Sequence, residues 1–279
     1  MATTAQKRLN LTIAKTIRYL EKVSDQPSAK NVHKFRTHSR RVETVLRELV
    51  SDSPRSQEKV VKQLGRLRKK AGRIRDLNVQ IAALRNLKMP QAAAQKAELM
   101  RVLLEELAKR EEQIGRLADK EVVREIRKRL KRAATDSVLP SDEELLLIAT
   151  QKIEQLGRGE ALTEETLHGY RVAGKKARYL AELVASSEAQ QIIQQLKRMQ
   201  DVLGEWHDWW QLAAKAENHL GSVEKTPLTA VLQNVTRAKF RQALAEVAET
   251  RNALLQKSEA LSPRKPARAS DHYHATAVA

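Results

Sequence analysis

A pattern of charged residues occurs twice in this chain of 279 residues, and it constrains the fold more than any other feature. In each copy a histidine is followed by one basic residue and then, at the same spacing, by two adjacent basic residues. The copies are His33-x-x-Arg36-x-x-x-Arg40-Arg41 and His168-x-x-Arg171-x-x-x-Lys175-Lys176. A repeat on this scale indicates two similar structural units that pack as neighbours.

Each copy is followed by a second matching segment. The segments are Leu64…Gly72-Arg-Ile-Arg75-Asp76 and Leu196…Gly204-Glu-Trp-His207-Asp208. We therefore predict two units, residues 1–140 and 141–260, with a boundary near Leu139-Pro140-Ser141.

The composition favours helices throughout. The chain has only 9 Gly and 7 Pro, and no run of β-branched residues alternates with polar ones. We predict an all-α protein of two four-helix bundles related by a pseudo-twofold axis, followed by a disordered tail over 261–279. Capping residues and helix breakers give expected helices over 5–24, 28–50, 54–88, 91–134, 142–157, 163–185, 187–219 and 227–260.

The charge balance indicates a polyanionic partner. The chain carries 52 Lys and Arg against 34 Asp and Glu, a formal net charge of +18. It has no cysteine, which excludes disulfides, thiol nucleophiles and cysteine-ligated metals. No apolar run approaches the roughly 18 residues of a membrane span, and the N-terminus has no signal-peptide core. We expect a soluble, cytoplasmic protein that does not bind membranes.

The repeated basic residues share one face of each helix. On a helical wheel with about 100° per residue, Arg36, Arg40 and Arg47 fall within about 60° of the repeated histidine. Like charges at this spacing repel each other, so the stripe is costly until an anion arrives. We predict one composite anion site in a basic central cavity. The expected contact residues are His33, Arg36, Arg40, Arg41, Arg47, His168, Arg171, Lys175, Lys176 and Arg178, with Lys15, Arg18, Lys22, Arg66, Lys69 and Arg73 from neighbouring helices.

A solvated helix face is the alternative explanation for any single basic run, and only the repetition argues against it. Along the helix expected over 91–134, both explanations remain open. Asp76 and Asp208 are expected to hold an arginine or lysine in place rather than to contact the anion.

These paired motifs resemble the conserved histidine α-helical domain, or CHAD, family. The resemblance rests on both His-x-x-Arg motifs, on Arg75-Asp76-Leu-Asn-Val and on Leu203-Gly204-Glu-Trp-His207-Asp208, and it covers roughly residues 5–260. It implies two four-helix bundles around a basic cavity that binds inorganic polyphosphate, and association with polyphosphate granules. Family members are often fused to a triphosphate tunnel metalloenzyme domain, whose Glu-x-Glu-x-Lys motif we do not find here.

The second repeat departs from the first at two positions. Lys69 and Arg73 correspond to Asp201 and Glu205, which makes the second half less basic in this segment. We expect these two acidic residues to lie off the anion path.

Two motifs suggest an enzyme, but each lacks an essential part. Gly169-x-x-x-x-Gly174-Lys175-Lys176 is close to a P-loop, yet Lys176 replaces the magnesium-binding Ser or Thr and no strand precedes it. His207-Asp208 with His168 hints at helical metal-dependent phosphohydrolases, but the only later aspartate is Asp271 in the tail. We expect no catalytic residue, no metal site and no cofactor.

Nucleic acid is the strongest alternative partner, because the same cations neutralise any phosphate chain. Only 3 Trp, 4 Tyr and 2 Phe are present, and no row of exposed rings is expected on which bases could stack. A cavity between two bundles also suits a slender chain better than a duplex. Trp206, Trp209 and Trp210 share a helix face, and we expect them to pack in the core or against a protein.

Overall fold

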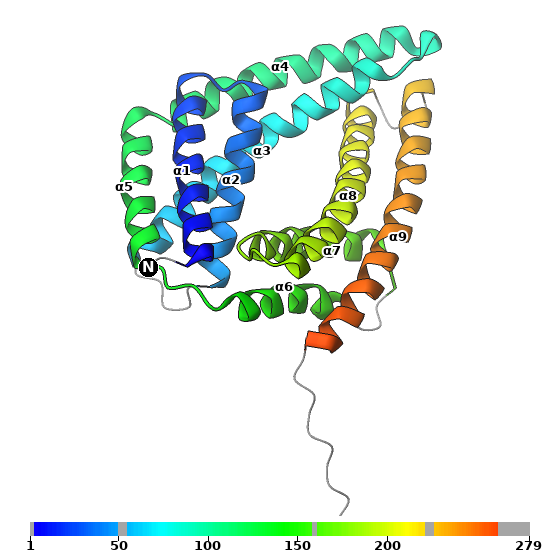
Figure 1. Ribbon diagram of the computed structural model, residues 1–279. Helices are drawn as coiled ribbons and strands as arrows, with labels where there is room; N and C mark the ends of the chain where they lie inside the picture. The colour runs from blue at the N-terminus through cyan, green and yellow to red at the C-terminus, as the bar shows by residue number, and fades with distance from the viewer. Residues whose placement is uncertain (1–2, 50–54, 158–160, 221–225, 262–279) are drawn as a thin grey trace, which may run out of the picture.

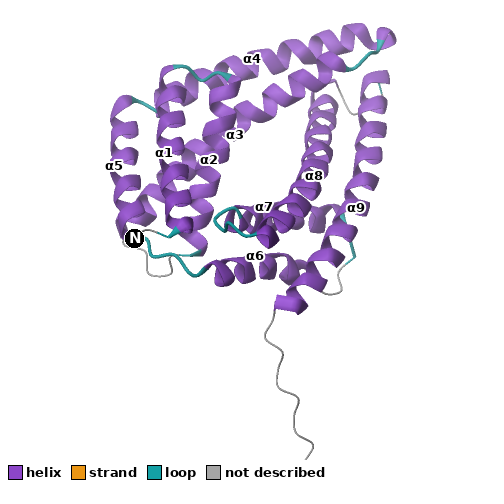
Figure 2. Ribbon diagram, viewed as in Figure 1, coloured by secondary structure: helices purple, strands orange, loops and turns teal. Residues whose placement is uncertain are grey.

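The computed structural model describes residues 3–49, 55–157, 161–220 and 226–261, and its regular structure in these ranges is entirely helical (Figure 2). The all-α prediction is therefore confirmed. The predicted tail over 262–279 lies outside the described residues. The helices are α1 (Thr4–Asp25), α2 (Ala29–Glu48), α3 (Arg55–Asn86), the short 3₁₀ helix η1 (Pro90–Ala92), α4 (Ala93–Leu117), α5 (Lys120–Asp136), α6 (Asp142–Gly157), α7 (Glu164–Ala181), α8 (Ser187–Leu220) and α9 (Pro227–Leu261).

The single helix predicted over 91–134 is wrong, because the chain breaks there into α4 and α5. Asp119 caps the start of α5: its side chain accepts a hydrogen bond of 2.8 Å from the backbone N–H of Val122. The backbone of Asp119 is extended, with φ −63° and ψ 166°, and this ends the α-helical hydrogen-bond ladder. The first half therefore contains five α-helices where four were predicted.

The helices form two groups that lie side by side (Figure 1). In the first group α1, α2, α3 and α5 pack against one another, and in the second group α6, α7, α8 and α9 do so. Helix α2 meets α7 between the groups, and α3 and α4 both contact α8. The four helices that carry the repeated motifs therefore face one another across this interface. None of the helices in the described ranges is long and apolar enough to cross a membrane.

Two hydrophobic clusters stabilise the described chain. The larger cluster extends through both groups and includes Phe35 of α2 and Tyr170 of α7. The smaller cluster joins α3 and α4 to α8 and α9, with Leu99 of α4 at its centre of packing partners. Because α2 directs Val32, Phe35 and Val42 into the core, its opposite face is free to carry basic residues into the interface.

Truncation of Leu99 tests whether the smaller cluster holds the two groups together. Leu99 is 0% exposed, so Leu99→Ala should lower the free energy of unfolding by about 2–5 kcal/mol. Leu104, which lies on the same helix and is 41% exposed, provides the matched control: Leu104→Ala should cost less than about 1 kcal/mol. Urea unfolding followed by circular dichroism measures both. Equal losses in the two variants would contradict this account of the core.

Candidate anion-binding site

The repeated motifs converge on a cavity of about 410 Å³ between the two groups of helices. Helices α2 and α7 supply its basic residues from the first motif, and α3 and α8 contribute residues from the second. The cavity therefore lies where the two sequence repeats meet. Its basic lining residues are His33, Arg36, Arg75, Arg171, Lys175 and Arg178.

Lys175 lies among positive charges. Burial, together with Arg171, Arg40 and Arg36, lowers the pKa of Lys175 to about 5. Lys175 forms no salt bridge with a described residue, whereas the Nζ of its neighbour Lys176 lies 2.7 Å from a Glu48 carboxylate oxygen. The free protein therefore holds the Lys175 amine in its neutral form at pH 7.

The arginines around Lys175 are also buried without a carboxylate of their own. Burial lowers the pKa of Arg36 to about 10, and it lowers the pKa values of Arg40 and Arg171 as well. Arg171 is only 8% exposed, and its Nε has no hydrogen-bond partner among the described residues. Buried donors without an acceptor are costly, so an anion that accepts from them would stabilise the site. We call Arg36, Arg40, Arg171 and Lys175 the cation cluster.

Asp76 and Asp208 hold Arg75 at the edge of the cation cluster. The Nη1 of Arg75 lies 2.7 Å from Oδ1 of Asp208 and 3.3 Å from Oδ1 of Asp76. Burial alone would lower the pKa of Arg75, but the hydrogen bond to Asp208 raises it above its usual value. This is the role expected for the two aspartates. The sequence analysis did not include Arg75 among the contact residues, although it occupies the place of His207 in the repeated motif.

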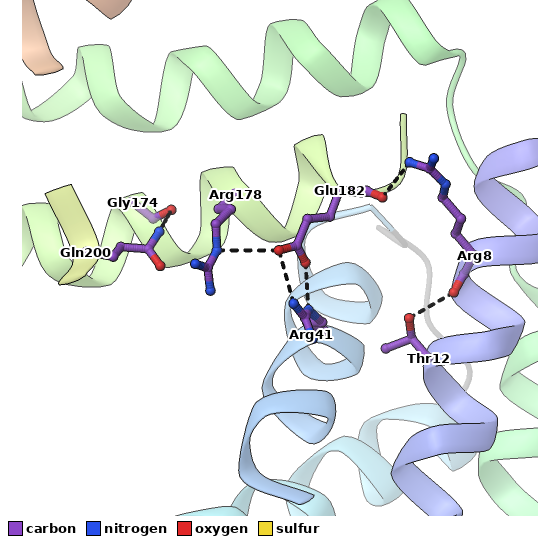
Figure 3. A network of polar contacts seen from close by, with 7 residues as sticks. All are labelled: Arg8, Thr12, Arg41, Gly174, Arg178, Glu182 and Gln200. Atoms are coloured by element: carbon purple, nitrogen blue, oxygen red, sulfur yellow. Dashed lines mark hydrogen bonds and ion pairs between the residues drawn. The ribbon is translucent and has the colours of Figure 1, made fainter. Parts of the chain in front are cut away.

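Arg41 and Arg178 share a carboxylate that connects α2 to α7 (Figure 3). Nε and Nη2 of Arg41 donate to the two oxygens of Glu182 at 2.6 and 3.1 Å. Nε of Arg178 lies 3.5 Å from Oε1 of the same residue. Arg178 lines the central cavity, whereas Arg41 lines a separate cavity of about 280 Å³ together with Lys15.

Two of the residues predicted in the motif helices lie away from the central cavity. Lys176 and Lys152 both pair with Glu48, at 2.7 and 2.6 Å, and these ion pairs connect α2, α6 and α7. Arg47 is exposed on α2 and does not line the cavity. The structure thus separates these two residues from the cation cluster.

The predicted residues of α1 and α3 are exposed and do not line the central cavity. Lys22 lies over the ring of Tyr19, with 5.7 Å between Nζ and the ring centroid. Arg73 lines a shallow depression of about 310 Å³ that also contains Trp210. The six residues in this group are Lys15, Arg18, Lys22, Arg66, Lys69 and Arg73.

The motif histidines lie at and beside the cavity. His33 lines it, and burial together with Arg36 lowers its pKa. The ring of His168 lies 6.0 Å from that of His207, whose pKa burial and Arg171 lower to about 4. His33 and His207 are therefore neutral at pH 7 in the free protein, and each offers one ring N–H donor where protonated rings would offer two.

Aromatic residues of α8 continue outward from His207. Trp206 is buried and packs against Phe240, as expected for a core residue. Trp210 stacks on His207, with ring centroids 5.7 Å apart, and is 42% exposed. Trp210 therefore lies partly at the surface, close to the residues that line the cavity.

Asp201 and Glu205 line one wall of the cavity, so the expectation that they lie off the anion path is wrong. The two halves do not place corresponding residues equivalently: Lys69 and Arg73 are exposed outside the cavity, while their counterparts on α8 face it. Oε1 of Glu205 lies 2.9 Å from Nζ of Lys239 on α9, which offsets part of its charge. The cavity is cationic on α2, α3 and α7 and acidic along α8.

The residues behind the two enzyme motifs take other roles. Gly169 and Gly174 lie inside α7, which is helical from Glu164 to Ala181 and leaves no loop to wrap a phosphate. Asp208 is paired with Arg75. Within the described ranges, no group of three or more histidines and carboxylates is placed to hold a metal ion.

Removing the Lys175 amine tests the cost of the cation cluster. Because the pKa is about 10.4 in an unfolded chain and about 5 here, the unfolded state binds one more proton between these pH values. Wild-type stability should therefore rise with pH relative to Lys175→Met, and the variant should have the higher Tm at pH 6 with a smaller advantage at pH 9. Thermal unfolding at both pH values measures this.

The neighbouring residue supplies the matched control for that measurement. Lys176→Met removes an ion pair with Glu48 and no buried, unpaired amine, so it should not raise the Tm. A Tm of Lys175→Met below that of the wild type at pH 6 would contradict the burial of an unpaired amine.

Comparison with known proteins identifies the family. The sequence model of the CHAD domain matches residues 7–217. The fold is similar to the crystal structure of the CHAD domain from the plant Ricinus communis, with a TM-score of 0.68 and 15% identity over 90% of each chain. It is also similar to PptA from Streptomyces chartreusis, with a TM-score of 0.67 and 16% identity over 91% of this chain and 98% of that one. No curated protein sequence matches significantly. The chain belongs to the CHAD domain family.

Proposed function

We propose that this protein binds inorganic polyphosphate in its central cavity and is a binding module rather than an enzyme. The observation that carries the proposal is the cation cluster, four basic residues brought together without a carboxylate of their own. Such a cluster is complementary to a ligand that brings several negative charges close together. The identity of the anion as polyphosphate comes from the CHAD resemblance.

Each part of the cavity has a distinct role in this proposal. Arg36 and Arg171 donate paired N–H groups to phosphoryl oxygens, and they come from opposite repeats. Lys175 gains a proton as the anion enters, because a nearby negative charge raises the pKa of an amine. Binding therefore takes up a proton, and affinity rises as pH falls toward the pKa of about 5 in the free protein.

A long polymer extends beyond the cavity. The exposed cations of α1 and α3, among them Lys15 and Arg66, then bind further phosphates of the same chain. Affinity should therefore increase with polymer length and decrease with salt. Association with polyphosphate granules in the cytoplasm would follow from this preference.

Competition binding at about 150 mM salt tests the identity of the ligand, since exposed charges are screened there within roughly 8 Å. Tryptophan fluorescence provides the signal, because Trp206, Trp209 and Trp210 lie on α8 and Trp210 stacks on His207. Long-chain polyphosphate should displace bound ligand at a lower phosphate concentration than duplex DNA or single-stranded RNA. Equal competition by the nucleic acids would overturn the proposal and favour a general nucleic-acid-binding protein.

Substitution within the cation cluster tests the location of the site. Arg36→Gln combined with Arg171→Gln should weaken polyphosphate binding by about a hundredfold, because each removes a charged donor worth about 1.5–3 kcal/mol. The control is Lys120→Gln with Arg124→Gln on α5, where both residues are exposed, and it should change affinity by less than about threefold. Circular dichroism establishes that both variants fold. Equal losses in both would move the binding site to the outer surface.

A further inference from the structure

The amine of Lys175 combines three properties that no other described lysine of the motif helices shares. It lines a cavity that a small molecule can enter, it has no carboxylate partner, and it is surrounded by arginines. Its sequence neighbour Lys176 points to another part of the protein and pairs with Glu48. Two adjacent lysines therefore have opposite environments.

The charged groups that face Lys175 come from every helix around the cavity. Arg36 and Arg40 approach from α2, Arg75 from α3 and Arg171 from α7. The acidic wall on α8 offers less compensation, since Asp208 is paired with Arg75 and Glu205 with Lys239. Burial and these cations lower the pKa of Lys175 to about 5, so the amine keeps its lone pair at pH 7. An ordinary lysine is almost completely protonated at that pH and is a poor nucleophile.

The same arginines that suppress the positive charge of the amine also attract phosphate. A small molecule that bears both a phosphate and an electrophilic carbon would be bound with that carbon next to the free amine. Acyl phosphates are the chemical class that meets this requirement, because their carbonyl carbon is one oxygen away from the phosphorus.

We propose that Lys175 is a covalent modification site that is acylated by acyl phosphates bound in the central cavity. The Lys175 nitrogen attacks the carbonyl carbon, and a C–N bond forms. The bond between that carbon and the phosphate oxygen breaks, and inorganic phosphate leaves with the electron pair and accepts the proton lost by nitrogen. The products are an amide on Lys175 and free phosphate. Arg36 and Arg171 stabilise the negative charge on the leaving phosphate.

Acylation also changes the site. An amide cannot gain a proton when an anion arrives, and the acyl group occupies part of the cavity. Modified protein should therefore bind polyphosphate more weakly, a consequence that rests on the proposed function. The acylation itself depends only on the cavity and its charges.

Acetyl phosphate and site-resolved mass spectrometry test the proposal on the full chain. At pH 7, Lys175 should be acetylated at least about tenfold faster than Lys176, which serves as the internal reference. Between pH 7 and 9 the rate at Lys176 should rise about tenfold per pH unit, as for ordinary lysines, whereas the rate at Lys175 should stay nearly constant. Equal rates at the two lysines, or parallel pH profiles, would overturn the proposal.

Two further measurements separate the parts of the argument. An uncharged acetylating ester should show a smaller preference for Lys175 over Lys176 than acetyl phosphate does, because the arginines cannot recruit it; an equal preference would refute acyl phosphates as the selected class. Long-chain polyphosphate should protect Lys175 and not Lys176. Selective acetylation without protection would leave the modification site established and count against the polyphosphate proposal alone.

Discussion

The burial of like charges in the cation cluster is the interaction on which the rest of the structure depends. Desolvation and mutual repulsion both oppose it, and together they lower the pKa of Arg36 to about 10 and that of Lys175 to about 5. The hydrophobic faces of α2 and α7 must therefore keep these residues together. Phe35 and Tyr170, which are fully buried in the same cluster of apolar side chains, belong to the packing that does so.

Carboxylates are placed around the cation cluster rather than within it. Glu48 of α2 pairs with Lys176 of α7, Glu182 of α7 pairs with Arg41 of α2, and Asp208 of α8 pairs with Arg75 of α3. Each of these ion pairs joins one half of the chain to the other. They are partly exposed, so each adds modest stability, but together they fix the position of one repeat on the other. The halves can then hold the unpaired cations at a defined separation.

The sequence predicted the helices of the site better than it predicted which side chains face the ligand. The spacing of the two motifs placed Arg36, Arg171 and Lys175 correctly on one face of each helix, because that face follows from the helical period alone. Arg41 and Lys176 are each one position further along, and a rotation of about 100° turns them toward Glu182 and Glu48. Those two partners lie in the opposite repeat, so only tertiary structure reveals them.

The same limit explains the other differences. Asp119 was a recognisable helix start, but the absence of Gly and Pro nearby favoured one long helix over 91–134. Asp201 and Glu205 were matched to Lys69 and Arg73 by the repeat, yet only the pair on α8 lines the cavity. A sequence repeat reports that two segments have the same local structure, and it does not require that their side chains have equivalent surroundings.

The difference between the two motifs at their seventh position follows from the charge of the empty site. Arg40 occupies this position in the first repeat and Lys175 in the second, and they act on each other's neighbourhood. A guanidinium stays protonated at every physiological pH, whereas an ammonium can release its proton when it is crowded by cations. An arginine at both positions would make every charge of the cation cluster permanent. A lysine at one of them lets the empty cavity lose one charge and recover it when an anion enters, so the same residue limits the repulsion without a ligand and adds to the attraction with one.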